Sequence, residues 1–309
     1  MKGTVSIVGA GRVGRTLGRR LRERGWRIGA VVTRRPGTAR AAVAAIGAGS
    51  PMIFSGGKGL YLRARRRKAS RKLPLDLDAV FAADVVFLTT SDDVLPAIAR
   101  ALARHAGAKC RGKIILHTAA TLDRTALLPF ARLGAAVGSL HPMQAFGANV
   151  MPQLGRVIFA IEGDPRARRT AQSIAKSLGG IPVTVRTQDK PIYHASAVLA
   201  AGSMYPTMEA GLELLTRIGF TRRRAEQTLF PLIRQILDNI ERLGPRAAWT
   251  GPLSRGDYAI VARHMRALRK HPREIQEAYA ALAILAGRVL AKDPAATLKK
   301  IHQVLGESR

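Results

Sequence analysis

The stretch TVSIVGAGRVG, Thr4 to Gly14, decides the fold of this 309-residue chain. Its first half is a short apolar run, which is typical of a buried strand. Its second half has the spacing Gly-x-Gly-x-x-Gly, and apolar residues four apart follow it, as on one face of a helix. A glycine loop between a strand and a helix is typical of a dinucleotide-binding βαβ unit.

Each glycine of this loop has an expected role. Gly9 permits the tight turn, Gly11 lets the backbone approach a pyrophosphate, and Gly14 lets the helix pack closely on the strand. The free N–H groups and the positive end of the helix dipole would attract the phosphates. We therefore predict that a dinucleotide is bound by Gly9, Ala10, Gly11, Arg12, Val13 and Gly14.

The second predicted strand ends in VVTRRPG, Val31 to Gly37. A dinucleotide-binding chain usually has an Asp or Glu about twenty residues after the glycine loop, where it binds the ribose 2′-hydroxyl. This chain has Thr33, Arg34 and Arg35 instead. Two guanidinium groups would bind a 2′-phosphate in bidentate fashion, and Thr33 would add a hydroxyl donor. The sequence therefore predicts NADP(H) as the cofactor rather than NAD(H).

Short apolar runs and helical patterns alternate through the first half of the chain, which indicates a parallel sheet of βαβ units. From about residue 188 the chain has long helical patterns and no convincing strand, and Pro206 should kink or interrupt the first of these helices. We predict an α/β fold: a Rossmann-type parallel-sheet domain over residues 1–187, followed by an all-α C-terminal domain over residues 188–309.

The net charge of +31 raises nucleic acid or anionic membranes as partners. The cations are dispersed, however, and the densest run, Tyr61 to Lys72, lies in a basic insertion at about residues 51–72. We interpret residues 58–72 as a solvated surface segment, with a contact to nucleic acid or an acidic partner as the alternative. No apolar run is long enough for a membrane span, and the single cysteine, Cys110, allows no internal disulfide. We expect a cytoplasmic protein.

Polar residues follow several predicted strands, at the rim where a ligand crevice is expected. Thr89, Thr90 and Ser91 should border the cofactor, whereas Asp92 or Asp93 could cap the next helix. His117 and His141 each follow a strand and are candidates for cofactor or substrate contact, or for loop hydrogen bonds. No third ligand stands at a useful spacing, so no metal site is predicted.

The stretch TQDKPIYHASA opens the helical half and places Lys190, Tyr193 and His194 on one helix face. A carbonyl that accepts hydride develops negative charge on oxygen and needs a proton donor or cation nearby. Lys190 is the first candidate and His194 the second, with His141 also a candidate catalytic residue. The alternative is a structural or solvated cation near the helix start.

A polar turn, WTGPLSRGDY, separates two helices further along the chain. Gly251 belongs to a loop that could close on an anionic substrate, and Arg255 is the candidate for binding a substrate carboxylate. Asp257 is a further candidate for substrate contact, and it should also be the N-cap of the helix that follows.

Together these pieces resemble a family of Rossmann-like oxidoreductases whose C-terminal half is the domain of unknown function 2520. That family is related in architecture to pyrroline-5-carboxylate reductase and the β-hydroxyacid dehydrogenases, and some members look like ketopantoate reductases. The matching pieces are GAGRVG, LTTSDD, LHTAAT, SLHPMQAF, DKPIYHASAVLA and TGPLSRGD. The chain departs from the pattern at Ala119 and Ala120, where Ser-Gly is common, at Gly202, near a common Asn or Ser-Pro, and in its basic insertion.

The resemblance implies an NADP(H)-dependent reductase that transfers hydride to a C=O carbon, for which a 2-keto acid such as ketopantoate is the leading substrate. It also implies a homodimer formed through the helical domains. His117, His141, Gln144 and Tyr193 would shape the pocket. An imine reductase, a non-catalytic NADP(H)-binding redox sensor and a basic nucleic-acid-binding protein remain the alternatives.

Overall fold

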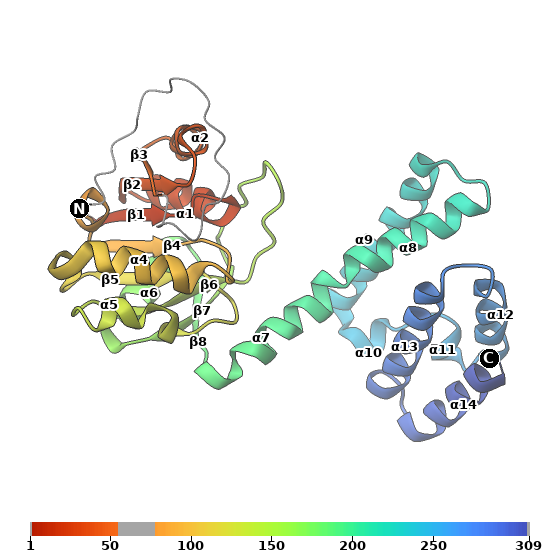
Figure 1. Cartoon of the computed structure of the whole chain (residues 1–309). Coiled ribbons are helices and arrows are strands. Elements are labelled where there is room, and N and C mark those ends of the chain that lie inside the picture. The colour runs from red at the N-terminus through yellow and green to blue at the C-terminus, as the bar shows by residue number, and fades with distance from the viewer. Residues whose placement is uncertain (1, 55–77, 308–309) are drawn as a thin grey trace. The chain divides into compact units, whose positions relative to one another are not determined.

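The computed structural model of the protein describes residues 2–54 and 78–307. The chain divides into two compact units, Met1–Leu199 and Ala200–Arg309 (Figure 1). The predicted boundary after residue 187 lies just before a helix that the first unit keeps, and the functional division into domains stays a prediction. The basic run at residues 58–72 lies outside the described residues.

The first unit is built around one eight-stranded sheet with the order β3-β2-β1-β4-β5-β6-β7-β8. All neighbours are parallel except β6 and β7, which are antiparallel, so the predicted sheet is mostly rather than wholly parallel. The strand β3 was missed, because residues 51–53 were assigned to the basic insertion. The strands are β1 Thr4–Val8, β2 Arg27–Thr33, β3 Ser50–Ile53, β4 Val85–Leu88, β5 Ile114–His117, β6 Ala136–Pro142, β7 Ile158–Gly163 and β8 Ile181–Thr184.

Helices cover both faces of this sheet (Figure 1). Alternate residues of β4 show why: Phe87 packs in the cluster that contains Leu17 and Ile174, whereas Leu88 packs with Leu102 and Phe130. Because these strands are buried on both faces, they read as continuous apolar runs. One face is covered by α1 Arg12–Glu23, α2 Pro36–Ile46 and α6 Pro165–Ser177, and the other by α3 Asp78–Phe81, α4 Leu95–Ala106 and α5 Leu128–Ala131.

The strand order reverses at β1, which has β2 on one side and β4 on the other. In open α/β sheets the ligand crevice lies at such a switch point, outside the carboxyl ends of the strands. The sheet and its two helical layers confirm the predicted Rossmann-type domain.

The last helix of the first unit is α7, Lys190–Ala197, and a π-helical turn, Val198–Gly202, continues it. Pro206 lies in the first turn of α8, so the predicted interruption occurs at the π turn just before it. No strand occurs in the described part of the second unit, as predicted for the C-terminal half. Its helices are α8 Met204–Arg217, α9 Arg222–Leu243, α10 Pro245–Ala248, α11 Pro252–Arg255, α12 Tyr258–Leu268, α13 Arg273–Val289 and α14 Pro294–Glu307.

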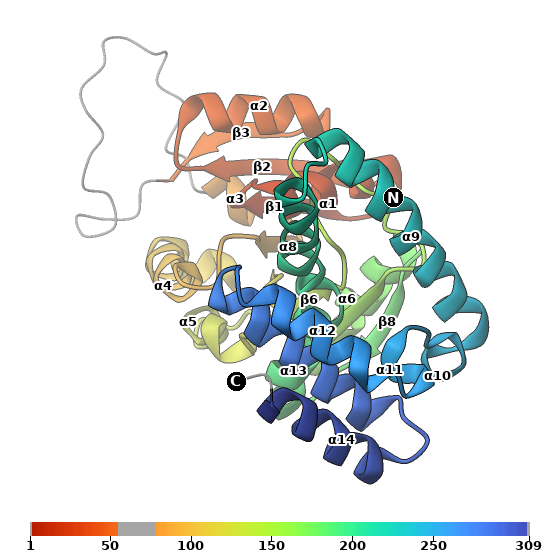
Figure 2. The same ribbon diagram turned by 90° about the vertical axis from the view of Figure 1, so that its right-hand side faces the viewer.

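Few apolar side chains of the second unit are fully buried. Val261 of α12, Ala283 of α13 and Ile301 of α14 mark its small core, and Figure 2 shows these three helices packed together. Helix α9 instead leaves a row of large apolar side chains in solvent: Phe230, Leu232, Ile236, Leu237, Ile240 and Leu243. None of the helices among the described residues has the length and hydropathy that a membrane crossing requires.

Candidate active site at the carboxyl ends of the strands

The three glycines of the loop differ in what surrounds them. Gly9 has a φ of +96°, and a Cβ built there would lie 2.6 Å from the Thr90 methyl carbon. A Cβ on Gly14 would lie 2.9 Å from the Gly9 carbonyl oxygen and against the Thr89 hydroxyl. Beside Gly11, in contrast, the nearest protein atom is 4.0 Å away. The fold itself therefore needs Gly9 and Gly14, whereas the bare backbone of Gly11 leaves open space for a ligand.

A groove of about 580 Å³ opens at this loop. Helix α1 begins here without a side-chain cap and without an acidic residue in its first turn, so its positive dipole end is not neutralised locally. The lining includes most of the predicted cofactor residues and four that were not predicted, Thr38, Asp93, Val94 and Ile98. The full lining is Gly9, Ala10, Gly11, Thr33, Arg34, Arg35, Thr38, Thr89, Thr90, Ser91, Asp93, Val94 and Ile98.

The predicted 2′-phosphate site is the turn after β2. Arg34 and Arg35 are exposed there and line the groove, and the lining residues of this turn include no carboxylate. The Thr33 hydroxyl donates to the Arg35 carbonyl at 2.9 Å, so it stabilises the turn instead of pointing a free donor at a ligand. Arg12, Val13 and Gly14 form the first turn of α1 and do not line the groove.

The segment after β4 holds the glycine loop in place. The Thr89 hydroxyl donates to the Gly9 carbonyl at 2.7 Å. The expected cap of α4 by an acid is wrong, because Val94 occupies the N-cap position without a side-chain bond. Asp92 instead accepts a hydrogen bond from Thr121, and Asp93 lines the groove.

His117 is fully buried at the end of β5, and both of its ring nitrogens are engaged. The backbone N–H of Ala119 donates to Nδ1 at 3.1 Å, which leaves Nε2–H to donate to the Asp123 carbonyl at 3.0 Å. Burial, reinforced by the charge of Lys190, lowers the pKa of His117 to about 4. His117 is therefore neutral and organises the loop after β5, which is the alternative role that the sequence left open, and a contact with a cofactor stays a prediction.

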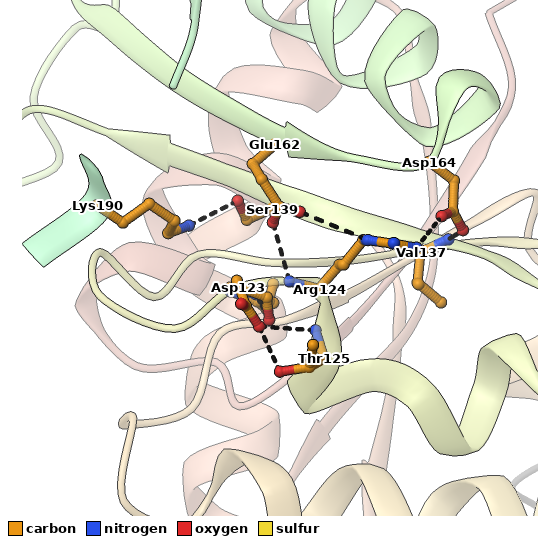
Figure 3. Close-up of polar contacts among 9 residues, drawn as sticks. Asp123, Arg124, Thr125, Val137, Ser139, Glu162, Asp164 and Lys190 are labelled. Carbon is orange, nitrogen blue, oxygen red and sulfur yellow. Dashed lines mark hydrogen bonds and ion pairs between the residues drawn. The ribbon is translucent and has the colours of Figure 1, made fainter. Parts of the chain in front are cut away.

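Lys190 begins α7 and is almost fully buried, with 2% of its surface exposed. Its Nζ donates to the Ser139 hydroxyl of β6 at 2.8 Å (Figure 3). Burial lowers the pKa of the Lys190 amine, and the carboxylates of Glu162, Asp123 and Asp92 oppose that shift. This lysine is a buried cation beneath the rim of the sheet.

Further residues around Lys190 were not predicted from the sequence. Glu162 of β7 lies opposite Ser139 in the strand register, and Figure 3 shows it beside Ser139 and Arg124. Arg124 binds Glu162 through its backbone N–H at 2.9 Å and Asp164 through its guanidinium at 2.7 Å. The available signal was an acidic residue inside the apolar run RVIFAIEG, residues 156–163.

A second cluster lies at the end of β6. The Tyr193 hydroxyl is 3.2 Å from His141 Nδ1, and the His194 and His141 ring centroids are 6.2 Å apart. Burial, together with the charges of His194 and Lys190, lowers the pKa of His141 to about 4. Burial raises the pKa of Tyr193 to about 12. At neutral pH His141 is therefore neutral and Tyr193 keeps its proton.

The predicted catalytic residues of the first unit thus gather along β6 and α7. All of them are partly exposed except Lys190, which is buried. The remaining predicted residue of this region, Gln144, makes a local bond to the Ala145 carbonyl. Among the described residues, no group of three or more His, Cys, Asp or Glu side chains could hold a metal ion.

Residues 157–285 match the domain of unknown function 2520 (DUF2520). The match confirms the resemblance seen in the sequence motifs. A search of curated protein sequences finds no match.

Solved structures share the fold over nearly the whole chain. A Bacteroides fragilis protein provisionally assigned as an NADP oxidoreductase has a TM-score of 0.69 at 19% identity, covering 96% of this chain and 98% of that one. A Thermotoga maritima protein has a TM-score of 0.62 at 20% identity, covering 99% and 100%. The reductive aminase of Aspergillus terreus has a TM-score of 0.64 at 14% identity, covering 97% and 99%. At these identities the likeness establishes the fold.

The DUF2520 segment contains Glu162 and Lys190 and also the predicted substrate loop of the second unit. There Gly251 has a φ of +103° and is the N-cap residue of α11. Arg255 Nε donates to the Asp257 carboxylate at 3.0 Å, and both side chains are exposed. Asp257 occupies the N-cap position of α12 but accepts no bond from that helix, so the expected capping bond is replaced by this ion pair. A contact between Arg255 and a substrate stays a prediction.

Proposed function

We propose that this protein is an NADP(H)-dependent oxidoreductase that reduces a C=O carbon by hydride transfer. The single observation that carries the proposal is the groove at the switch point of the sheet. It combines the open backbone at Gly11 with the uncapped start of α1 and with Arg34 and Arg35. A pyrophosphate fits the first two features, and a 2′-phosphate fits the arginines.

The structural relatives support the choice of cofactor. The structure of the Aspergillus terreus reductive aminase is a complex with NADPH and ethyl-5-oxohexanoate, and the Bacteroides fragilis protein carries an NADP oxidoreductase assignment. Both share this fold, and the groove of the present chain has the residues that the cofactor would need.

Bound NADPH would supply the hydride, and the chain's own residues would manage the charge on the substrate oxygen. Lys190 and Tyr193 lie three apart on α7 and bind Ser139 and His141, which lie two apart on β6. A buried ammonium stabilises a developing oxyanion strongly, because the surrounding dielectric is low. Tyr193 keeps its proton at neutral pH and is partly exposed, so its hydroxyl is the donor that a substrate can reach, whereas Lys190 is buried.

We propose a small carboxylate-bearing substrate, with a 2-keto acid such as ketopantoate as the leading example and Arg255 as the group that binds its carboxylate. A C=N substrate is the second candidate, favoured by the fold shared with the reductive aminase. NADPH oxidation with a panel of 2-keto acids and cyclic imines tests both. We expect turnover with at least one 2-keto acid. Tight NADPH binding without turnover of any compound would favour the redox-sensor alternative and end the enzyme proposal.

We also propose that the protein works as a homodimer. The apolar row on α9 is too extensive to leave in water on a small helical unit with few buried residues. A second copy of the same helix would cover it through an isologous contact. Analytical ultracentrifugation should give twice the chain mass, and Leu237→Glu should shift it toward the monomer. A monomeric wild-type protein at micromolar concentration would contradict this assignment.

A further inference from the structure

Glu162 is an acidic side chain within an apolar strand. Only 7% of it is exposed, compared with 0% of Ser139 opposite it and 2% of Lys190. Taking a carboxylate out of water costs several kcal/mol unless a partner charge and hydrogen bonds offset the loss. Burial raises the pKa of the Glu162 carboxyl, and the backbone N–H of Arg124 and the charge of Lys190 oppose that shift.

The hydrogen bonds of Glu162 offset only part of the cost of burying its carboxylate. One oxygen, Oε2, accepts the backbone N–H of Arg124 at 2.9 Å. The Arg124 guanidinium stands 3.8 Å from Oε1, whereas it donates to Asp164 at 2.7 Å. Asp164 in turn accepts a hydrogen bond from the backbone N–H of Val137. Arg124 therefore mainly connects the loop after β5 to β6 and α6 (Figure 3). The charge of Glu162 remains available to another cation.

That cation is Lys190. Its ammonium reaches Ser139 Oγ at 2.8 Å, and Ser139 pairs with Glu162 across β6 and β7. Side chains of such directly opposite residues lie on the same face of the sheet, with their Cβ atoms about 4.5–5.5 Å apart. Glu162 is the first of the three carboxylates whose charges act on Lys190, and Lys190 acts in return on Glu162.

The other ionisable groups that face Lys190 are less able to hold its charge. The Asp123 carboxylate accepts bonds from the backbone and hydroxyl of Thr125, and the Asp92 carboxylate accepts one from Thr121. Both aspartates are partly exposed, so water screens them. His117 and His141 also interact with Lys190, and both are neutral at physiological pH.

We propose that Glu162 is a positioning residue, which keeps the buried Lys190 amine in its ammonium form and, together with Ser139, holds it against β6. Glu162 acts through Lys190 and does not itself touch a substrate. The effect on turnover rests on the proposed function, whereas the effect on Lys190 does not.

The first test is an NMR titration of the Lys190 side-chain amine in the full-length protein, with its signal assigned by Lys190→Arg. We compare wild type, Glu162→Gln, Glu162→Asp and the control Glu226→Gln, which removes a partly exposed acid of α9 in the other unit. Glu162→Gln should lower the pKa of Lys190, Glu162→Asp should restore part of it, and the control should leave it unchanged. An unchanged Lys190 titration in folded Glu162→Gln protein overturns the proposal.

The second test is the pH profile of NADPH oxidation with the best substrate found. Glu162→Gln should move the alkaline limb to lower pH, so that kcat falls about tenfold more at pH 9 than at pH 6, while KM for NADPH stays the same. An equal loss at every pH would indicate structural damage and contradict the proposal. If Glu162→Gln does not fold, Ser139→Ala replaces it in the titration, and an unchanged Lys190 there is the contradicting result. Absence of turnover in wild type would count against the oxidoreductase alone, because the titration still measures Lys190.

Discussion

Lys190 donates a hydrogen bond to Ser139 at 2.8 Å and so joins the first residue of α7 to the middle of β6. Both side chains are buried, and the contact fixes where helix α7 begins relative to the rim of the sheet. One helical turn later, Tyr193 reaches His141 on the same strand. Two contacts between α7 and β6 thus position the candidate catalytic groups of this unit. The Lys190–Ser139 contact is buried and charged, whereas the Tyr193–His141 contact is partly exposed and neutral.

Tyr193→Phe tests the contribution of the Tyr193 hydroxyl, which contacts His141. We expect kcat with the best carbonyl substrate to fall about 10- to 100-fold, because the hydroxyl donor is lost while the ring packing remains. The second unit offers a matched control, since the Tyr279 hydroxyl is 2.8 Å from His264 Nδ1 in a similar His–Tyr pair. Steady-state rates for Tyr279→Phe should equal those of wild type. An equal drop in both variants would mean that the loss reflects a general effect on folding.

Substitution of the loop glycines separates ligand binding from folding. Gly11→Ala should leave the free energy of unfolding within about 1 kcal/mol of wild type, because its φ is −75° and nothing lies within reach of a Cβ. It should nevertheless weaken NADPH binding at least about tenfold by filling the groove. Gly14→Ala should destabilise the protein by about 1–3 kcal/mol through its clash with Gly9 and Thr89. Urea unfolding and NADPH titration of the two variants measure both effects. If Gly11→Ala bound NADPH as well as wild type does, the cofactor would not lie against this backbone.

The buried His117 predicts a loss of stability in acid. Its pKa of about 4 in the folded protein lies below the 6.5 expected in the unfolded chain. Between these values only the unfolded chain takes up the proton. The contribution of His117 to the free energy of unfolding is therefore complete above pH 6.5 and is lost as the pH falls toward 4. We expect His117 to contribute about 2 kcal/mol to the drop in the free energy of unfolding between pH 7 and pH 5.

Urea unfolding at these two pH values checks this expectation. His117→Gln should be less stable than wild type at pH 7 and should lose part of the pH dependence. His302→Gln, which removes an exposed imidazole of α14, should keep the wild-type difference between pH 7 and pH 5. A His117→Gln variant with the full wild-type pH dependence would show that His117 is not the titrating group.

The sequence was most informative where one local rule decided the structure. The strand, the glycine turn and the helix of Thr4–Gly14 follow from spacing alone, and the groove contains Arg34 and Arg35 where the motif places them. Strand β3 was missed because its four residues, SPMI, include a proline and have no alternation. Their pairing with β2 is a tertiary effect that a single short run does not reveal.

The candidate site was harder to predict, because the burial of a side chain depends on elements far away in the sequence. Lys190 looked like an accessible proton donor, yet it is buried by its contact with β6, which lies about fifty residues earlier. His117 has the same rim position as His141, but its loop takes up both of its nitrogens. Glu162 drew no attention, since the residues around it come from β6, from the 3₁₀ turn Arg124–Leu127 and from α7 and share no local motif.

We propose that Arg34 and Arg35 select the 2′-phosphate, and the ratio of the Kd values for NADH and NADPH measures this selection most directly. Fluorescence titration of the wild-type protein should give a much lower Kd for NADPH than for NADH. In Arg34→Asp the NADPH Kd should rise about 10- to 100-fold while the NADH Kd changes little, because a charge-assisted bond to the extra phosphate is worth about 1.5–3 kcal/mol. Arg40→Asp, an exposed change on α2 outside the groove, should keep the wild-type ratio. Equal losses for both nucleotides in Arg34→Asp, or a wild type that does not distinguish them, would contradict the claim.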